Sequence, residues 1–328
     1  MTVFYMACCI GRKCLRRESE FELFLEFFLV LSAVMCLIGF ILMVGGYDLY
    51  RLLGVHEVYI AKAAPFAPGR LDDRFIRTVL GRGIIRMGSI YYEPVNLAYF
   101  FALAFLCAVF KNPFRQVSLR YITICFSLAG LVFTLGKGGY IIVLMAVFCL
   151  LGAYILRRLF RIPYDKCSDS RLLLAMILIS FAGVAAVVIL FVIFSHDREL
   201  IMPHIRGIAG AAYSIANRPW GYGTGMGGNA AMTFNGNITT KSDWYAIGGE
   251  TALMSVMYQL GIQGLIVFAI CVISTGYNRI KKMSSFEKIV FCMPWILICV
   301  SLLQDNTFTP QCIVPYMLVM GGAYKNAD

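Results

Sequence analysis

The sequence predicts an all-α fold, that of a polytopic helical membrane protein, and three features favour this class. First, hydrophobic residues make up 60% of the 328-residue chain and charged residues only 14%, with a mean hydropathy of +0.76. Such a chain has too little polar surface to cover a water-facing globule. Second, apolar runs of about 20 residues, the length that crosses a hydrocarbon core, recur along the chain. Third, these runs are continuous rather than alternating, which favours spanning helices over a membrane β-barrel.

The apolar runs predict eight membrane spans, separated by polar or glycine-rich sequence. We place them at 22–46, 94–110, 120–135, 138–157, 172–195, 250–273, 287–304 and 309–323. The second, third and last are short, so flanking residues or a thinned bilayer would complete the crossing. The opening MTVFYMACCI is too short to span. It is interpreted as the remnant of an upstream helix, with a signal-peptide remnant or an interfacial segment as alternatives.

The domain prediction is a single membrane domain over 1–328, with a first outer loop at 47–93 and a large outer loop at 196–249. The first of these is interpreted as a loop with short helical pieces. Nearly all Lys and Arg residues outside these two loops fall in segments that we place on the cytoplasmic side, following the positive-inside rule. Both termini are therefore predicted to be cytoplasmic. The net charge of +11 then serves contact with anionic membrane lipids, and no nucleic-acid partner is expected.

The positions of the cysteines and the scarcity of ionisable residues in the spans argue against a disulfide-bonded protein, a zinc protein and an ion pump. None of the 12 cysteines lies in the two long outer loops, and no pair has a zinc-site spacing with histidine, so neither disulfides nor a metal site is predicted. Ionisable residues are scarce within the spans, apart from Glu22, Glu26 and Lys137, whereas ion pumps need such groups at membrane depth. The polar residues gather instead in the two outer loops.

The first candidate segment, RMGSIYYEPVNLAYF, lies just before and within the second span. It places Arg86, Glu93 and Asn96 at a helix entrance, with Pro94 suited to the first helical turn. The alternative is a membrane-entry cap with two interfacial tyrosines. A second segment, TLGKGG at 134–139, joins two spans and carries Lys137 at its tip. Lys137 contacts a phosphate in one interpretation and extends to the membrane interface in the other.

The third segment, HIRGIAGAAYSIANRPWGYGTGMGGN, begins as an amphipathic helix with His204 and Arg206 and closes on Arg218 and a glycine-rich loop. Backbone N–H groups in such a loop, including those of Gly223 and Gly225, can approach an anion, and arginine supplies a fork of donors for phosphate. The glycines do not follow a parallel strand, so a dinucleotide fingerprint is excluded. A lone histidine is usually structural, but in a basic, water-exposed loop it suits a base that changes charge near neutral pH.

The fourth segment, GETALMSVMYQLGIQGLIVF, places Glu250 at the outer end of a predicted span that also contains Gln259 and Gln263. The carboxylate of Glu250 either caps the helix N-terminus, where the dipole favours negative charge, or contacts an arginine or a sugar hydroxyl.

Taken in order, these four segments resemble the O-antigen polymerase and O-antigen ligase superfamily of membrane glycosyltransferases, over about 86–268. The family often has Ser-Arg-Gly-Gly at the tight turn, where this chain has Gly136 to Gly139 with Lys137, so bidentate phosphate binding is lost there. The resemblance implies a helical GT-C-like fold with a large extracytoplasmic loop, in the bacterial cytoplasmic membrane. It also implies transfer of a glycan from undecaprenyl diphosphate to a sugar hydroxyl, without metal or cofactor. A flippase and a chain-length regulator are further expected partners.

Residue roles follow from that match. Arg86, Arg206 and Arg218 are expected to hold the diphosphate, His204 to position or deprotonate the acceptor, and Glu93 and Glu250 to orient arginine or sugar hydroxyls. Lys137, Asn96, Gly223 and Gly225 complete the expected substrate contacts. A polymerase is favoured over a ligase that acts on lipid A core or protein. A transporter or flippase is disfavoured because no inverted repeat and no unwound, charged site within a span is visible, and a purely structural membrane protein would not need these clustered polar groups.

Overall fold

The computed structural model describes residues 2–61, 75–79, 82–159, 172, 174–183, 185–186, 202–228, 231, 238, 240–273 and 283–326. About 81% of these residues are helical, which confirms the all-α class. Part of the predicted fifth span, and parts of both predicted outer loops, lie outside the described residues. The chain groups into two compact units, the first formed by residues 1–143 with 309–326 and the second by 144–308.

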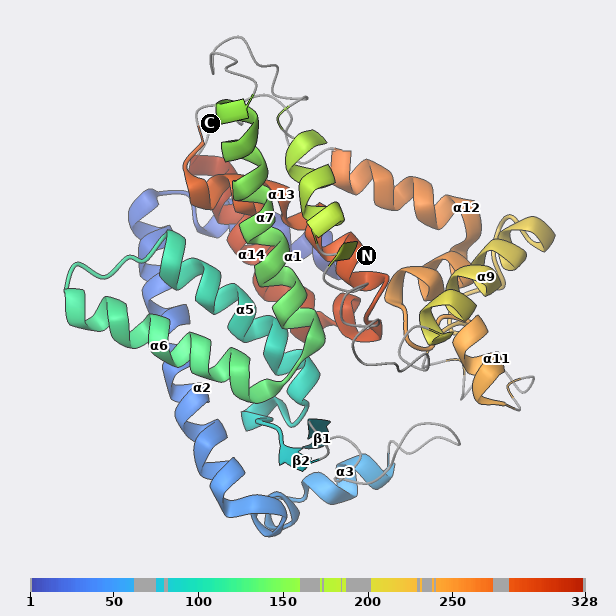
Figure 1. The fold of residues 1–328 in the computed structure, drawn as a ribbon, viewed down its shortest axis with the longest axis horizontal. Coiled ribbons are helices and arrows are strands. Elements are labelled where there is room, and N and C mark those ends of the chain that lie inside the picture. Colours follow the sequence, from blue (N-terminus) through green and yellow to red (C-terminus); the bar gives the residue numbers. More distant parts are fainter. Residues whose placement is uncertain are drawn as a thin grey trace. The chain divides into compact units, whose positions relative to one another are not determined.

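The first unit contains the N-terminal helices and the last helix (Figure 1). Its elements are α1 (Thr2–Cys14), α2 (Glu18–Leu52), α3 (Val55–Ala61), β1 (Ile76–Val79), β2 (Arg82–Ile85), the 3₁₀ turn η1 (Ser89–Tyr91), α5 (Pro94–Phe110), α6 (Val117–Thr134), the start of α7 (Lys137–Leu159) and α14 (Pro310–Asn326). In α2 the backbone leaves helical geometry at Gly46 (φ 62°), where the predicted first span ends. A glycine tolerates this left-handed conformation because it has no Cβ.

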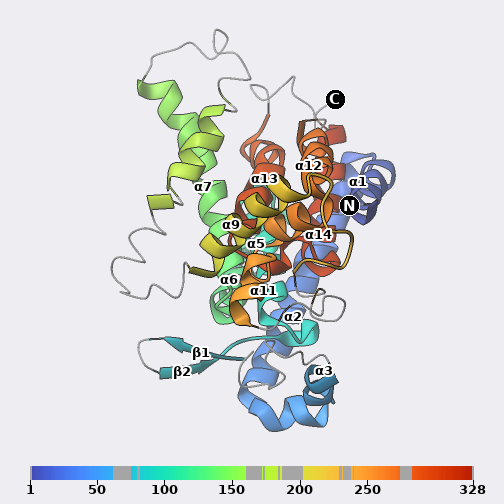
Figure 2. The same cartoon turned by 90° about the vertical axis from the view of Figure 1, so that its right-hand side faces the viewer.

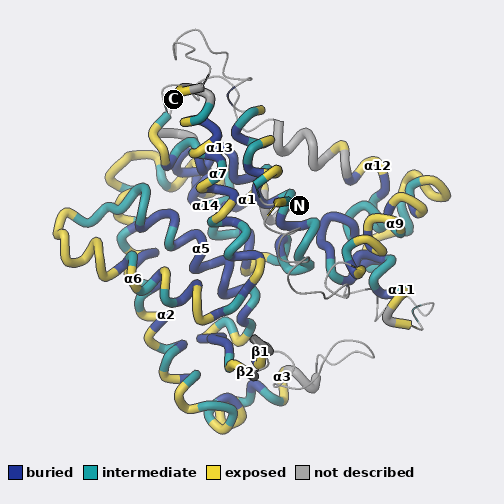
Figure 3. Tube along the Cα trace, in the orientation of Figure 1, coloured by how far each residue is buried: buried dark blue, intermediate teal, exposed yellow. Residues whose placement is uncertain are grey.

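Helix α5 forms the core of the first unit. Thirteen of its 17 residues are buried, and it packs against α2, α6 and α14 (Figures 1 and 3). A helix that is apolar all round, as PVNLAYFFALAFLCAVF is, suits such a surrounded position. The Tyr316 hydroxyl of α14 donates to the Tyr99 carbonyl at 2.7 Å, which fixes the two helices against each other. The predicted second span therefore coincides with α5, and protein rather than lipid surrounds most of it.

A β-hairpin follows α3, and the sequence did not predict it. Strands β1 and β2 pair antiparallel, with Ile76 opposite Ile85 and Val79 opposite Arg82, near the C-terminal end of α2 (Figure 2). Phe75, just before β1, packs against Tyr50 of α2 with ring centroids 4.4 Å apart and the rings tilted by 48°. Segment 47–93 was expected to be a loop with short helical pieces. That expectation was right for α3 and wrong for the hairpin, whose four-residue strands are too short for a recognisable alternation.

The second unit contains the rest of α7, a helical piece at 174–183, α9 (Met202–Asn217), α11 (Lys241–Ala246), α12 (Ala252–Ile273), α13 (Ser285–Ser301) and η4 (Asp305–Phe308). Capping boxes start two of its helices: Thr240 pairs reciprocally with Asp243 at α11, and Ser284 pairs with Glu287 at α13. Helix α9 packs along α11 and the first half of α12.

Among the described residues, three helices are long and apolar enough to cross a membrane: Glu18–Leu52, Val117–Thr134 and Lys137–Ile155. Two shorter apolar helices are Pro94–Phe110 and Leu174–Gly183. These apolar helices indicate a membrane protein. The number of spans, the side on which each terminus lies and the GT-C-like arrangement stay predictions.

Helix α12 is broken at Gly261, where φ is 58° and ψ is −145°. The first half, Ala252–Leu260, is about 13 Å long at 1.5 Å per residue, which is too short to cross a hydrocarbon core of about 30 Å. The span predicted at 250–273 is therefore interrupted at Gly261, and its crossing of the membrane stays a prediction. An isolated glycine within an apolar run is usually tolerated in a helix, so sequence gave no sign of the break.

Candidate functional site

In the first unit, Arg86 caps the end of α6. Its side chain is 7% exposed, and its Nε donates to the Thr134 carbonyl at 2.9 Å. Thr134 is the last residue of α6, and Leu135 then turns into the left-handed region with φ 48°. Carbonyl groups at a helix C-terminus carry partial negative charge and lack intrahelical partners. Arg86 therefore stabilises the tight turn before Lys137, in addition to any contact with substrate.

The glycines of this turn allow it to approach α5 closely. A Cβ at Gly136 would overlap the Cβ of Ala98, and one at Gly139 would overlap the Ala98 carbonyl oxygen. A Cβ at Gly138 would overlap the ring of Tyr99. The turn that carries Lys137 thus lies against the first turns of α5, and the structure brings the first two sequence segments together.

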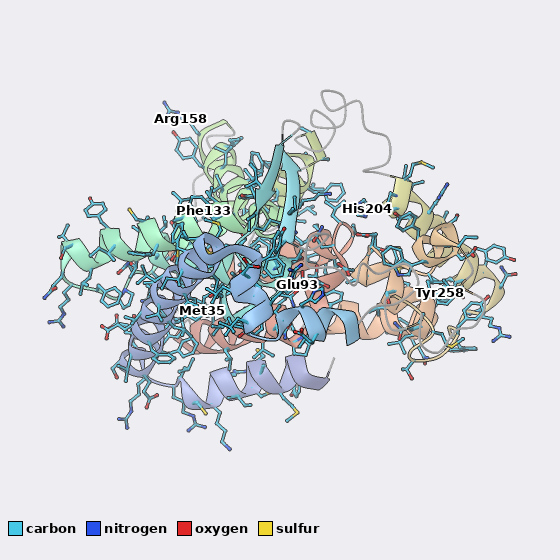
Figure 4. The ribbon with its side chains drawn as sticks, turned by 90° about the horizontal axis from the view of Figure 1, so that it is seen from below. Met35, Glu93, Phe133, Arg158, His204 and Tyr258 are labelled. Atoms are coloured by element: carbon cyan, nitrogen blue, oxygen red, sulfur yellow. The ribbon has the colours of Figure 1, made fainter. Side chains whose placement is uncertain are left out.

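Glu93 and Asn96 lie at the entrance of α5. Pro94 occupies the first helical turn as predicted. Glu93, which is labelled in Figure 4, is the N-cap residue but makes no side-chain capping hydrogen bond. Asn96 is 6% exposed, donates from Nδ2 to Gln311 Oε1 at 2.6 Å and accepts from the Cys312 thiol at 3.4 Å. Gln311, at the start of α14, was not among the predicted site residues, because only tertiary packing brings it to Asn96.

Tyr91 lies just before this entrance, in η1. Burial raises the pKa of its phenol to about 12, so the hydroxyl stays protonated and can donate a hydrogen bond throughout the physiological range. Its ring packs on Phe100, with centroids 5.8 Å apart. Tyr92 is exposed, which suits the interfacial position considered for it.

In the second unit, α9 separates the predicted catalytic residues into two sets. Gly207, one turn after His204, lies against Thr251, the residue after Glu250. Glu250 therefore lies near the N-terminal end of α9. That end also carries His204, which is half-buried (Figure 4), and Arg206, which is exposed on another side of the helix. Arg218 follows the C-terminal end of the helix, about 18 Å further along the axis at 1.5 Å per residue. In this arrangement Arg206 and Arg218 do not meet at one diphosphate, contrary to the expected joint role.

The glycine-rich loop fills the break in α12. A helix broken at Gly261 leaves carbonyls before the break and amides after it without intrahelical partners. The amides of Tyr222 and Gly223 donate to the carbonyls of Tyr258 and Gln259, both at 3.0 Å, and the Ile262 amide donates to the Pro219 carbonyl at 2.8 Å. The loop thus completes the hydrogen bonding of the broken helix.

Gln259 locks the loop in place, and sequence reasoning had given it no role. Its Oε1 accepts from the Gly225 amide at 2.8 Å, and its Nε2 donates to the Gly227 carbonyl at 3.2 Å and to Ser255 Oγ at 2.9 Å. The amides of Gly223 and Gly225 therefore bind Gln259, and an anion at these two amides would have to displace those bonds. The substrate contact of these glycines stays a prediction.

Arg218 is held in a defined orientation by two tyrosines. Its guanidinium carbon lies 4.9 Å from the ring centroid of Tyr222, and Tyr222 stacks on Tyr258 at 4.6 Å with an interplanar angle of 7°. A cation over an aromatic face is attracted by the ring quadrupole. Arg218 is therefore exposed and charged but oriented by its neighbours, as a binding arginine needs to be.

No family model, curated protein or solved structure matches this chain. The described residues include no group of three or more His, Cys, Asp or Glu side chains placed to hold a metal ion.

Proposed function

We propose that this chain is a membrane glycosyltransferase that polymerises undecaprenyl-diphosphate-linked oligosaccharide repeat units on the outer face of the cytoplasmic membrane. The observation that supports it is the pairing of the four sequence segments: the first packs with the second around Arg86, and the third packs with the fourth around Gln259. These are the segments on which the resemblance to O-antigen polymerases and ligases rests. Their pairing is what a shared function of the segments requires.

The proposed reaction forms a glycosidic bond from the acceptor hydroxyl oxygen to the anomeric carbon of the lipid-linked glycan. The bond from that carbon to the diphosphate oxygen breaks, and undecaprenyl diphosphate leaves with the electron pair. His204 takes the proton of the acceptor hydroxyl, and Glu250 orients the histidine or the sugar. Arg206 lies on the same end of α9 as His204 and is assigned to the developing negative charge of the leaving group.

The remaining residues bind substrate in this proposal. Arg218, oriented by Tyr222 at the other end of α9, is assigned to a more distant part of the glycan chain or to a second phosphate. Arg86, Lys137, Glu93 and Asn96 form the binding set of the first unit. Neither a metal nor a cofactor is invoked, because the leaving group is already activated and guanidinium groups can stabilise its charge.

Purified protein in liposomes tests the proposal, with a lipid-linked repeat unit as the only glycan and polymer length and released undecaprenyl diphosphate as readouts. We expect His204→Ala and Arg206→Ala to lower kcat by about 10²-fold or more. Arg218→Ala should mainly raise KM, because it lies too far along α9 to act on the same bond. Full-length polymer at normal rate from His204→Ala would refute the catalytic assignment. In a parallel assay with lipid A core added to the liposomes, glycan transfer to that core without polymer growth would instead identify a ligase.

A second candidate is a transporter or flippase for the same lipid-linked glycan, and the break in α12 favours it. Discontinuous helices that present unpaired backbone groups are typical of transporter substrate sites. In this chain the glycine-rich loop already occupies the break, which favours the enzyme. Movement of labelled glycolipid across the liposome membrane without glycan bond formation would establish the transporter instead.

A further inference from the structure

Helix α9 has an outward face that is almost entirely apolar. Pro203, Gly207, Ala211 and Ser214 are its buried residues, which recur at helical spacing on the side that packs against α11 and α12. The opposite side is exposed (Figure 3). Its exposed residues are Met202, Ile205, Arg206, Ile208, Ala209, Ala212, Tyr213, Ala216 and Asn217.

Polar groups lie only at the edges of this face. At 100° per residue, Arg206 and Asn217 fall on one edge and His204 near the other, while the centre holds only apolar side chains. Ile205 is 52% exposed and Ile208 50%. A water-facing helix of a soluble loop would carry its polar residues at the centre of the exposed face, so water is not the surface that this face fits.

The charges and aromatic residues around the face identify its partner. Residues 202–228 contain two arginines and no Asp or Glu, and both Arg206 and Arg218 are exposed. Tyr213 is 69% exposed and Trp220, one turn beyond the helix, is 73% exposed. Tyrosine and tryptophan favour the boundary between headgroups and acyl chains, and arginine beside an apolar face favours anionic lipid phosphates. The same chain carries helices of membrane-spanning length, which indicates that the protein is associated with a bilayer.

We infer that α9 is an interfacial helix whose exposed face, from Met202 to Ala216 together with Trp220, is seated in the lipid surface. The helix lies parallel to the bilayer plane, with its apolar residues at the top of the acyl chains and Arg206 and Arg218 at the level of the phosphates. Its opposite face holds α12 and α11. This inference does not depend on glycan transfer, since it rests on the exposed residues of α9 alone.

Fluorescence quenching by brominated lipids tests the contact in the full-length protein. The chain has three tryptophans, so one variant (Trp244→Phe, Trp295→Phe) retains only Trp220 and a matched variant (Trp220→Phe, Trp295→Phe) retains only Trp244. Trp244 is 7% exposed and serves as the buried control. In vesicles of phosphatidylcholine and phosphatidylglycerol brominated on the acyl chains, Trp220 should be quenched at least about threefold more strongly than Trp244, as expected for insertion at the headgroup boundary.

A second pair of variants tests whether the exposed face of α9 contacts lipid rather than protein. In the Trp220-only protein, Ile205→Gln with Ile208→Gln should lower the quenching at least about twofold, because the apolar anchor is lost. The matched pair Ile205→Leu with Ile208→Leu should leave it unchanged. Gel filtration and circular dichroism confirm that each variant is folded. If Trp220 is quenched no more than Trp244, the face packs against protein, either this chain or a second copy, and the inference is overturned.

Discussion

The side chain of Gln259 attaches the glycine-rich loop to α12, and a substitution at this position tests how strongly the loop is held. Its side chain joins the Gly225 amide, the Gly227 carbonyl and Ser255 Oγ. Gln259→Leu keeps a similar volume and removes all three bonds. At about 1 kcal/mol net for each bond, the free energy of opening the loop falls by about 3 kcal/mol. Since 1.4 kcal/mol is tenfold, the open state should become about 10²-fold more populated.

Hydrogen exchange of the Tyr222 and Gly223 amides reports this opening, because both donate to backbone carbonyls that the substitution leaves in place. Their exchange in detergent micelles, followed by mass spectrometry of the peptide 219–228, should accelerate by about 10²-fold. The control is Gln263→Leu, which removes one exposed bond of 3.3 Å to the Trp220 carbonyl and should change the rate by less than about tenfold. Unchanged exchange in Gln259→Leu, or the same acceleration in both variants, would refute the attachment.

Two further experiments test the helix break and the entrance of α5. Gly261→Ala should destabilise the protein by about 3 kcal/mol or more, because the added Cβ clashes with the Pro219 carbonyl and the residue is also held at a positive φ. Gly46→Ala has a similar positive φ but open space around the Cβ, so it should cost about 1–2 kcal/mol. Thermal unfolding in detergent measures both, and equal losses would contradict the packing argument. A double-mutant cycle of Asn96→Leu and Gln311→Leu should give a coupling of about 1 kcal/mol, and strict additivity would show that their 2.6 Å hydrogen bond contributes nothing.

Sequence was sufficient for the helices whose ends are marked by local signals. Residues 94–110 match α5 because Pro94 marks its start and polar residues follow Phe110. The predicted end of the first span coincides with Gly46, where α2 leaves helical geometry before it continues to Leu52. The break at Gly261 was missed because the glycine lies in an apolar run, and the signal for it is in the distant residues Pro219 to Gly223.

The candidate site was predicted as a set of residues but not as an arrangement. Arg86 was found from its charge, but its capping of α6 depends on Thr134, 48 positions along the chain. Gln259 and Gln311 carry neutral amides, which have no distinctive spacing until their partners are known. The separation of Arg206 from Arg218 follows directly from the helix between them. A continuous helix over 202–217 would have been enough to exclude their joint role.

The break in α12 makes the glycine-rich loop and this helix structurally dependent on each other. The Tyr222 and Gly223 amides of the loop donate to carbonyls of α12, and the Pro219 carbonyl accepts from an α12 amide. The backbone hydrogen bonding at the break therefore needs both segments. A chimera that exchanges only the loop would leave peptide groups at the break unpaired, and each such group costs about 1–3 kcal/mol when buried. An epitope tag inserted between Arg218 and Gly228 would damage α12 as well as the loop. Loop exchanges and tags therefore need to carry both segments together or to avoid both.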